Sequence, residues 1–191
     1  MPIGIKKTHD REEYMKIGII GPTKVDTFCR LKNIMKDAYL QYVSYVAESL
    51  AKTSHEIFLV PDKGSCAEHF ALAYQNAGGK RLNVLAPLQD KEFGHDWLNL
   101  QIANHVVDTK TWRSTPEELA RITETLVCFG LGVGSMIEIC YTRWYNVHSV
   151  YLLSEFVPRL PTEVGHKLHL VYVTTQEVVQ RLTSSPVMPQ V

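Results

Sequence analysis

Short, continuously apolar segments alternate with helical patterns along most of this 191-residue chain. Seven segments are expected to be strands, and most of them end at glycine, proline or polar residues. They span residues 14–20, 56–60, 81–86, 105–107, 126–129, 149–153 and 168–173. Strands that are apolar on both faces and are joined by helices form a parallel sheet with helices on both sides. The sequence therefore predicts a single-domain α/β protein with a Rossmann-like parallel sheet.

The segments between these strands carry helical patterns. Apolar residues recur at i, i+4 spacing over 34–50, which predicts a helix of about four turns. A second helix is expected over 67–77, where two glycines close it. Residues 115–118 have an N-cap threonine, a proline at the first helical position and a glutamate three residues after the cap. Shorter or later helices are expected over 97–102, after the glycines near 130 as far as Arg143, and from a cap at 174–177 through Leu182.

Chain length and the placement of the patterns predict the domain organisation. A chain of this length can bury one sizeable core and is too short for two independent ones. We expect one nucleotide-binding domain over residues 15–182. Residues 1–14 are expected to be a loose tail, and residues 183–191 a frayed end.

Composition excludes several classes of partner. Acidic and basic residues balance at 20 each, so no basic excess is available to hold duplex nucleic acid. No run of 18 apolar residues occurs, and the first residues lack the apolar stretch of a secretory signal. The four cysteines form no C-x-x-C pair and are expected to be buried, reduced thiols. We therefore expect a cytoplasmic protein that binds neither duplex nucleic acid nor membranes.

One strand-to-helix junction is unusually rich in glycine. Parallel sheets bind ligands beyond the carboxyl ends of their strands, so this junction is where a site is expected. Glycines let the backbone turn tightly and approach a ligand, and the first N–H groups of a helix favour an anion such as phosphate. The predicted phosphate-binding residues here are Gly130, Gly132, Val133, Gly134 and Ser135.

The same junction allows a structural alternative. Ser135 and Glu138 have the spacing of a capping box, in which the serine caps the helix and the glutamate reaches back to it. Taken alone, these two residues fit a structural role as well as a functional one. A capping box requires no glycine at 130, 132 and 134, so we favour an anion site. The spacing differs from G-x-G-x-x-G, so no nicotinamide cofactor is predicted, and no other cofactor is expected.

Two further loops after strands are candidates for the same site. Gly21, Thr23 and Lys24 follow the first strand and could bind an anion, although a plain turn fits equally well. Gly64 and Ser65 belong to the loop Asp62-Lys63-Gly64-Ser65 after the second strand, and only their position in the fold argues for a site.

Arg113 follows the uncertain fourth strand, where a lone arginine is usually just solvated. His166 and His169 lack an accompanying carboxylate, and no H-E-x-x-H occurs, so no metal site is predicted. No G-x-S-x-G elbow supports a Ser-His-Asp triad.

The glycine loop resembles a family signature. Proteins of the Lonely Guy group, also labelled lysine decarboxylase-like, carry Pro-Gly-Gly-x-Gly-Thr-x-x-Glu at this junction. Gly132, Gly134 and Glu138 match it, Ser135 replaces the threonine, and Gly130-Leu131 stands in place of Pro-Gly. The order of strands, helices and glycines over residues 15–182 is also similar.

This resemblance implies a nucleotide-binding protein with no cofactor, and a specific activity. Members of the family cleave the N-glycosidic bond of a nucleoside 5′-monophosphate, as phosphoribohydrolases, with an arginine and the motif glutamate. These roles map onto Arg113 and Glu138, although this chain has Arg113-Ser114 where the family usually has Arg-Lys. Cleavage builds positive charge on the ribose, which a carboxylate can stabilise. The alternative is a non-enzymatic nucleotide-binding or sensing protein on the same fold.

Association into a homodimer, or a larger oligomer built from dimers, is also expected. The segment 34–50 carries three tyrosines, Tyr39, Tyr42 and Tyr45, spread over more of its surface than one sheet contact needs. Aromatic residues are enriched in the cores of interfaces, although some tyrosines simply lie on the surface. The resembling family, whose members are commonly dimers, implies the same.

Overall fold

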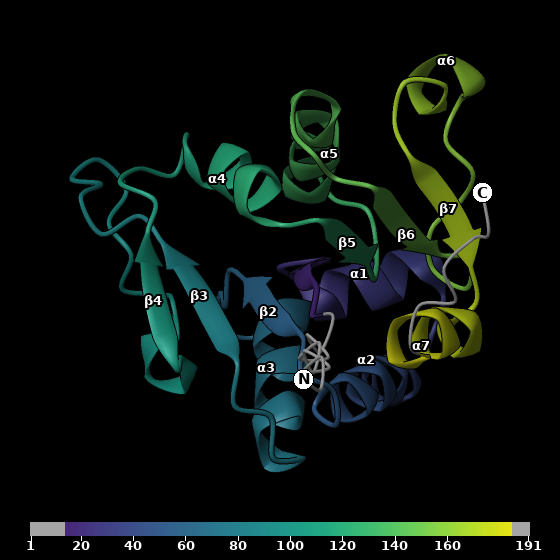
Figure 1. The fold of residues 1–191 in the computed structure, drawn as a ribbon, viewed down its shortest axis with the longest axis horizontal. Helices are drawn as coiled ribbons and strands as arrows, with labels where there is room; N and C mark the ends of the chain where they lie inside the picture. Colours follow the sequence, from purple (N-terminus) through teal and green to yellow (C-terminus); the bar gives the residue numbers. More distant parts are fainter. Residues whose placement is uncertain (1–13, 185–191) are drawn as a thin grey trace, which may run out of the picture.

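The computed structural model describes residues 14–184 and contains one seven-stranded sheet. All neighbouring strands pair in parallel, in the order β4-β3-β2-β1-β5-β6-β7 (Figure 1). The strands are β1 (Lys16–Ile20), β2 (Glu56–Leu59), β3 (Leu82–Ala86), β4 (His105–Asp108), β5 (Thr125–Cys128), β6 (Ser149–Leu153) and β7 (Leu170–Val173). Each expected strand is present with ends shifted by at most two residues, so the predicted parallel sheet is confirmed.

Helices cover both faces of this sheet, as the α/β prediction requires. In Figure 1, α1, α2, α3 and α7 lie on one face, while α4 and α5 lie on the other. The helices are α1 (Val25–Lys32), α2 (Lys36–Leu50), α3 (Cys66–Asn76), α4 (Thr115–Ile122), α5 (Val133–Tyr141), α6 (Thr162–Gly165) and α7 (Thr175–Thr183). Two 3₁₀ turns, η1 (Leu100–Ile102) and η2 (Thr142–Trp144), complete the described part of the chain.

An aromatic cluster anchors the helices of the first face. The ring of Tyr39 lies 5.3 Å from that of Phe28 and 5.0 Å from that of Phe156. Its hydroxyl group donates a hydrogen bond of 3.2 Å to the carbonyl oxygen of Phe129, the residue after β5. Tyr39 therefore ties α2 to the backbone that leads into the glycine loop. This tyrosine belongs to the core, whereas Tyr42 and Tyr45 are exposed.

Two helices and one cap differ from the expectations. The segment 25–32 forms a separate helix, α1, because Val25, Phe28 and Cys29 share one buried side, and Asn33 ends it in the left-handed conformation. The short α6 was not expected either. At the start of α4 the N-cap is Ser114, and none of the described side chains caps this helix, so the predicted threonine cap was wrong. The hydroxyl of Thr115 instead contacts the hydroxyl of Thr109, 2.7 Å away. The expected box at Thr174 and Glu177 is present.

The prediction that all four cysteines are buried was wrong for one of them. The four cysteines are unpaired, and three are buried, but Cys140 is exposed on α5. None of the helices within residues 14–184 is long and apolar enough to cross a membrane. Of the tails expected over residues 1–14 and 183–191, residues 1–13 and 185–191 lie outside the described residues.

The strand order places the ligand-binding edge. From β1 the chain builds the sheet outward through β2, β3 and β4, and it then returns to add β5 on the other side of β1. The chain therefore leaves the adjacent strands β1 and β5 toward opposite faces of the sheet. In open parallel sheets, ligands bind where the strand order reverses in this way, beyond the carboxyl ends of the strands.

Candidate functional site

Loops from four parts of the chain enclose a cavity of about 290 Å³ at this reversal point. They follow β1, β2, β4 and β5, and they lead into α1, α3, α4 and α5. A volume near 300 Å³ is at the lower end of small-molecule sites. The cavity can therefore enclose a small ligand, or the reactive part of a larger one.

The glycine loop supplies one wall of the cavity. Gly134 and Ser135 line it, while Gly132 is the N-cap of α5. A Cβ atom on Gly132 or Gly134 would meet no protein atom within 4 Å, and Gly132 has an extended backbone that any residue adopts. Neither the fold nor the local conformation requires glycine at these positions. Both glycines instead leave space at the start of a helix, where backbone N–H groups face outward.

The capping box predicted as an alternative for this junction is absent. The helix begins at Val133, two residues earlier than a Ser135 cap requires, and none of the described side chains caps it. The hydroxyl of Ser135 donates to the carbonyl oxygen of Gly21, 3.3 Å away. Glu138 lines the cavity one turn further along α5. The structural alternative for Glu138 is therefore removed.

Two other residues of this loop serve different purposes. Gly130 is buried, and a Cβ atom there would lie 2.6 Å from the ring of Phe28, so close contact with α1 explains this glycine. Val133 is 81% exposed and points away from the cavity wall, into an apolar groove on the outside of α5. The structure does not bring either residue into the cavity.

The loop after β1 contributes Gly21 and Thr23 to the cavity wall. Gly21 is closely packed, since a Cβ atom there would lie 3.0 Å from the sulfur of Cys66. Lys24 is the exposed N-cap of α1 and is not part of the wall.

The loop after β2 brings Ser65 and Asp62 to the cavity. Ser65 caps α3, because its hydroxyl accepts a 3.0 Å hydrogen bond from the backbone N–H of Glu68. Gly64 adopts the left-handed conformation, with φ of 79°, and lies outside the wall. The sequence pattern identified Asp62 only as a member of this loop. Apart from its place after a strand, no feature of the sequence indicated that it lines the cavity.

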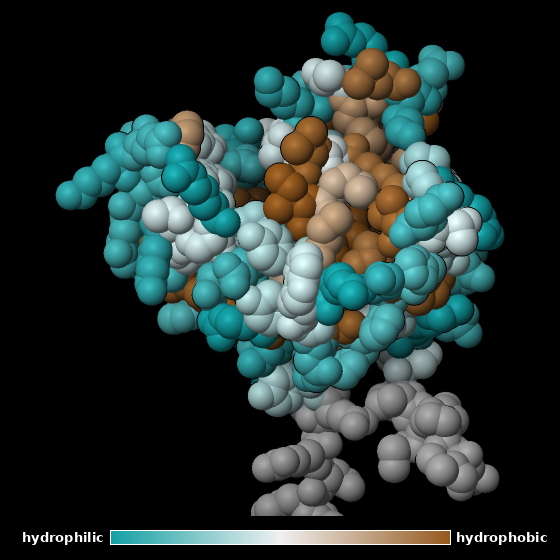
Figure 2. All heavy atoms as spheres, turned by 90° about the horizontal axis from the view of Figure 1, so that it is seen from above, coloured by the Kyte–Doolittle hydropathy of each residue, from teal (hydrophilic) through white to brown (hydrophobic). Residues whose placement is uncertain are grey.

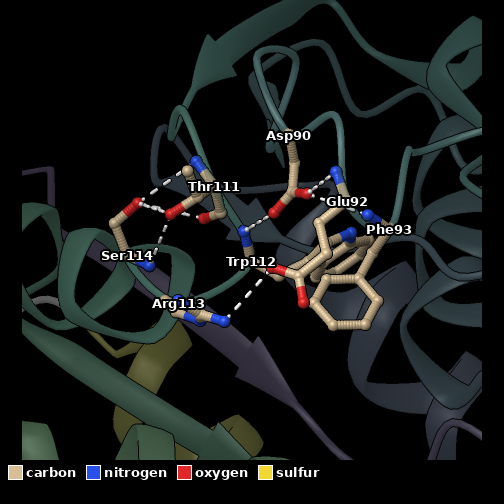
Figure 3. Close-up of polar contacts among 7 residues, drawn as sticks. All are labelled: Asp90, Glu92, Phe93, Thr111, Trp112, Arg113 and Ser114. Atoms are coloured by element: carbon tan, nitrogen blue, oxygen red, sulfur yellow. Dashed lines mark hydrogen bonds and ion pairs between the residues drawn. The ribbon is translucent and has the colours of Figure 1, made fainter.

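The loop after β4 differs most from the expectation. Arg113 extends away from the cavity, with its side chain 80% exposed, and forms an ion pair of 3.1 Å with Glu92 (Figure 3). The neighbouring Trp112 lines the cavity instead. The backbone N–H of Trp112 donates to the carboxylate of Asp90, 2.9 Å away, and this bond holds the loop against the β3–β4 connection. An aromatic ring therefore occupies the part of the wall where a cation was expected.

The cavity is acidic. Burial raises the pKa of Glu138 to about 8, and the carboxylate of Asp62 adds to this shift. Burial also raises the pKa of Asp62 to about 6, with a further contribution from Glu68. Among the described residues, no lysine, arginine or histidine lines the cavity. At neutral pH the wall thus holds one carboxyl group that is mostly protonated and one that is mostly ionised.

No group of three or more histidine, cysteine, aspartate or glutamate residues within the described range is arranged to hold a metal ion. The chemistry available in the wall is therefore that of two carboxyl groups, several hydroxyl groups, one indole ring and the N–H groups at the start of α5.

Comparison with known proteins finds similar proteins by structure alone. No protein-family model and no curated protein sequence matches the chain. The Moco carrier protein of Chlamydomonas reinhardtii is similar with a TM-score of 0.67 and 15% identity, covering 91% of this chain and 98% of that one. The molybdenum cofactor binding protein of the phototrophic bacterium Rippkaea orientalis has a TM-score of 0.63 and 14% identity, covering 90% and 99%.

The chain shares the fold of these molybdenum cofactor proteins. The structural-genomics target TM1055 has it too, with a TM-score of 0.58 and 20% identity over 88% of this chain and 98% of that one. At identities this low, the structural similarity establishes the Rossmann-like fold alone.

The raised pKa of Glu138 predicts a pH-dependent stability. Between its ordinary pKa of 4.5 and about 8, the folded state keeps a proton that the unfolded state has released, so stability falls as pH rises through this range. Above pH 8 both states are ionised and the loss stops. Glutamine imitates the protonated form. Glu138→Gln should match the parent at pH 5 and melt several degrees higher at pH 8, since about 1 kcal/mol corresponds to roughly 2–4 °C for this size.

Differential scanning calorimetry at both pH values measures this difference. The control is Glu48→Gln, which changes an exposed glutamate of α2 and should give no gain that depends on pH. A Glu138→Gln variant whose melting temperature differs from the parent by the same amount at pH 5 and pH 8 would contradict the assigned protonation.

Proposed function

We propose that this protein binds a phosphate-bearing small molecule in the cavity at the strand-order reversal, with the phosphate at the start of α5. The observation that carries the proposal is the pair Gly132 and Gly134 at the start of α5, where an added Cβ atom would meet no protein atom within 4 Å and none of the described side chains caps the helix. Gly134 lines the cavity, and Gly132 lines the groove on the outside of α5. Helix starts of this kind hold phosphate through those N–H groups and the helix dipole. A nucleoside 5′-monophosphate is the ligand that the glycine loop and its Lonely Guy resemblance favour.

The structural relatives support a binding function. Two of them are named as molybdenum cofactor carrier or binding proteins, so proteins of this fold hold a small cofactor. The molybdenum cofactor is accordingly the second ligand to be tested. This chain offers a cavity at one edge of a covered parallel sheet, and we infer a cytoplasmic binding protein.

Cleavage of the N-glycosidic bond is a second candidate function, and Glu138 carries it. Two cavity carboxyl groups whose pKa values differ, near 8 for Glu138 and near 6 for Asp62, form the kind of pair that divides acid and base roles. In such a mechanism the ionised group would stabilise positive charge on the ribose or orient a water molecule, and the protonated group would serve the leaving base. Arg113 would need to leave Glu92 to take part. Binding is therefore the better-supported function.

The first test of the proposal is ligand binding. AMP should raise the melting temperature of the parent in a thermal-shift titration, because a ligand that binds only the folded state stabilises it. Gly134→Asp should abolish this shift, because the added carboxylate fills and repels the anion site. Gly134→Asn, of the same size but uncharged, should weaken it less. A folded Gly134→Asp variant that binds AMP like the parent would show that the loop assignment is wrong, and the molybdenum cofactor is titrated in parallel.

A second test separates binding from catalysis. If the parent releases free base from a nucleoside monophosphate, Glu138→Gln should lower turnover by about a hundredfold or more while nucleotide affinity is retained. Base release is measured by chromatography over a panel of nucleoside monophosphates. Undiminished turnover in Glu138→Gln would exclude a catalytic role for this residue. A parent that binds nucleotide without cleaving any member of the panel leaves binding as the function.

We also propose that the protein associates through α5 rather than through the tyrosines of α2. An apolar groove of about 560 Å³ runs along the outside of α5, and Figure 2 shows a hydrophobic patch on this side of the molecule. The groove is lined by Leu131, Gly132, Val133, Met136, Ile137, Cys140, Tyr141 and Trp144. Trp144 is 69% exposed, and Ile137 lines both this groove and the ligand cavity. A second copy seated here would cover the patch with aromatic residues at its centre.

Light scattering at micromolar concentration tests this association. The parent should have twice the mass of one chain, and Trp144→Glu should have the mass of a monomer, because it places a charge in the lining of the apolar groove. Tyr45→Glu, which changes an exposed aromatic residue of α2, is the control and should remain a dimer. A monomeric parent would exclude association, and a monomeric Tyr45→Glu with a dimeric Trp144→Glu would place the interface on α2.

A further inference from the structure

The ring of Trp112 is held firmly at the cavity. It stacks on Trp97, with ring centres 5.5 Å apart and planes inclined by 13°. Its indole N–H donates a 2.7 Å hydrogen bond to the carbonyl oxygen of Gly94. Together with the bond from its backbone to Asp90, these contacts hold the ring in one orientation before any ligand arrives. Preorganised aromatic rings offer a flat face for stacking with little loss of conformational freedom on binding.

Asp62 is also held in place. The residue forms an isolated antiparallel bridge with Leu98, and the neighbouring Lys63 donates from its backbone N–H to the carbonyl oxygen of Trp97, 2.9 Å away. The loop after β2 and the β3–β4 connection are thus joined beside the cavity. Asp62 and Trp112 come from loops about 50 positions apart, yet they line the same small space with Glu138.

The basic residues of these loops are directed elsewhere. The ammonium group of Lys63 donates to the carbonyl oxygen of Asp96, 2.9 Å away, and Arg113 pairs with Glu92. Within the described residues, the cavity wall therefore combines two carboxyl groups and an indole ring with no cationic side chain. A positively charged heterocycle is attracted both by the indole face and by the ionised carboxylate of Asp62, whereas a neutral one of the same shape lacks this charge attraction.

We infer that the cavity selects nucleotides whose base is a cationic aromatic ring, such as an N-ribosylated pyridinium, with the base against Trp112 and its charge beside Asp62 and Glu138. This inference rests on the proposed function, since it takes the phosphate to lie at the start of α5. The ligand then matches the site at both ends, with its negative group at the helix N-terminus and its positive group at the acidic wall. Attraction of the cation to the indole face and to the ionised carboxylate of Asp62 supplies the selectivity.

Two nucleotides that differ in this charge provide the test. Nicotinamide mononucleotide carries a permanently charged pyridinium ring, and its reduced form carries a neutral dihydropyridine of nearly the same shape. Isothermal titration calorimetry with both compounds, and with AMP, should show that the oxidised form binds about tenfold more tightly than the reduced form, as expected for a partly desolvated cation–π contact and a nearby carboxylate.

Variants assign the preference to named residues. Asp62→Asn keeps the size of the side chain but removes its charge, and it should bring the ratio of the two affinities toward one. Trp112→Leu should do the same, while Trp112→Phe should retain part of the ratio because it keeps an aromatic face. Asp96→Asn removes one negative charge from an exposed position of the same connection and should leave the ratio unchanged. Circular dichroism establishes that each variant is folded.

The outcomes separate this inference from the function on which it rests. Preferential binding of the oxidised form that is lost in Asp62→Asn supports the inference. Equal binding of both forms, or tighter binding of the reduced form, overturns it while leaving the proposed nucleotide-binding function in place. Failure of all three nucleotides to bind the folded parent overturns the proposed function and the inference together.

Discussion

Parallel pairing is the constraint on which the rest of this structure depends. Because every strand runs in the same direction as its neighbours, each connection must cross a face of the sheet, and here helices make most of those crossings. The same constraint places the loops that leave the strands, and the helices that begin directly after them, at one edge of the sheet. The order then reverses at β1, so that the loops after β1 and β5 separate at that edge. The cavity lies in the resulting gap, and its position follows from backbone pairing before any side chain is considered.

The cavity combines two opposite electrostatic features. Uncapped N–H groups at the start of α5 favour negative charge, whereas Asp62 and Glu138 favour positive charge or hydrogen-bond donors. Burial raises the pKa of both carboxyl groups, so that at neutral pH Glu138 is mostly protonated and Asp62 is mostly ionised. A site with both features discriminates along its length, since each part of a ligand meets a different charge. This arrangement distinguishes the cavity from a simple phosphate site.

The expected strands were found because their signal is local. A strand buried on both faces must lack polar side chains along its length, as residues 17–20 do, so its pattern does not depend on its neighbours. The helix α1 was missed because only three of its residues are buried, and Leu31 is exposed. The capping boxes illustrate the same limit. Thr174 and Glu177 form one, whereas Ser135 and Glu138 do not, although the spacing is identical.

The amino-acid sequence by itself determined the parallel α/β fold and the glycine-rich start of α5, because apolar runs, helical spacing and glycine act over a few neighbouring residues. Only the tertiary structure decided which loop side chains face the cavity. Trp112 faces it and Arg113 does not, since Asp90 and Glu92 of a distant connection bind the Trp112 backbone and the Arg113 side chain. Likewise Asp62 and Glu138 line the same cavity because β2 and β5, the strands that precede them in the chain, lie on the two sides of β1. Side-chain direction in a loop depends on such long-range contacts, which no local pattern contains.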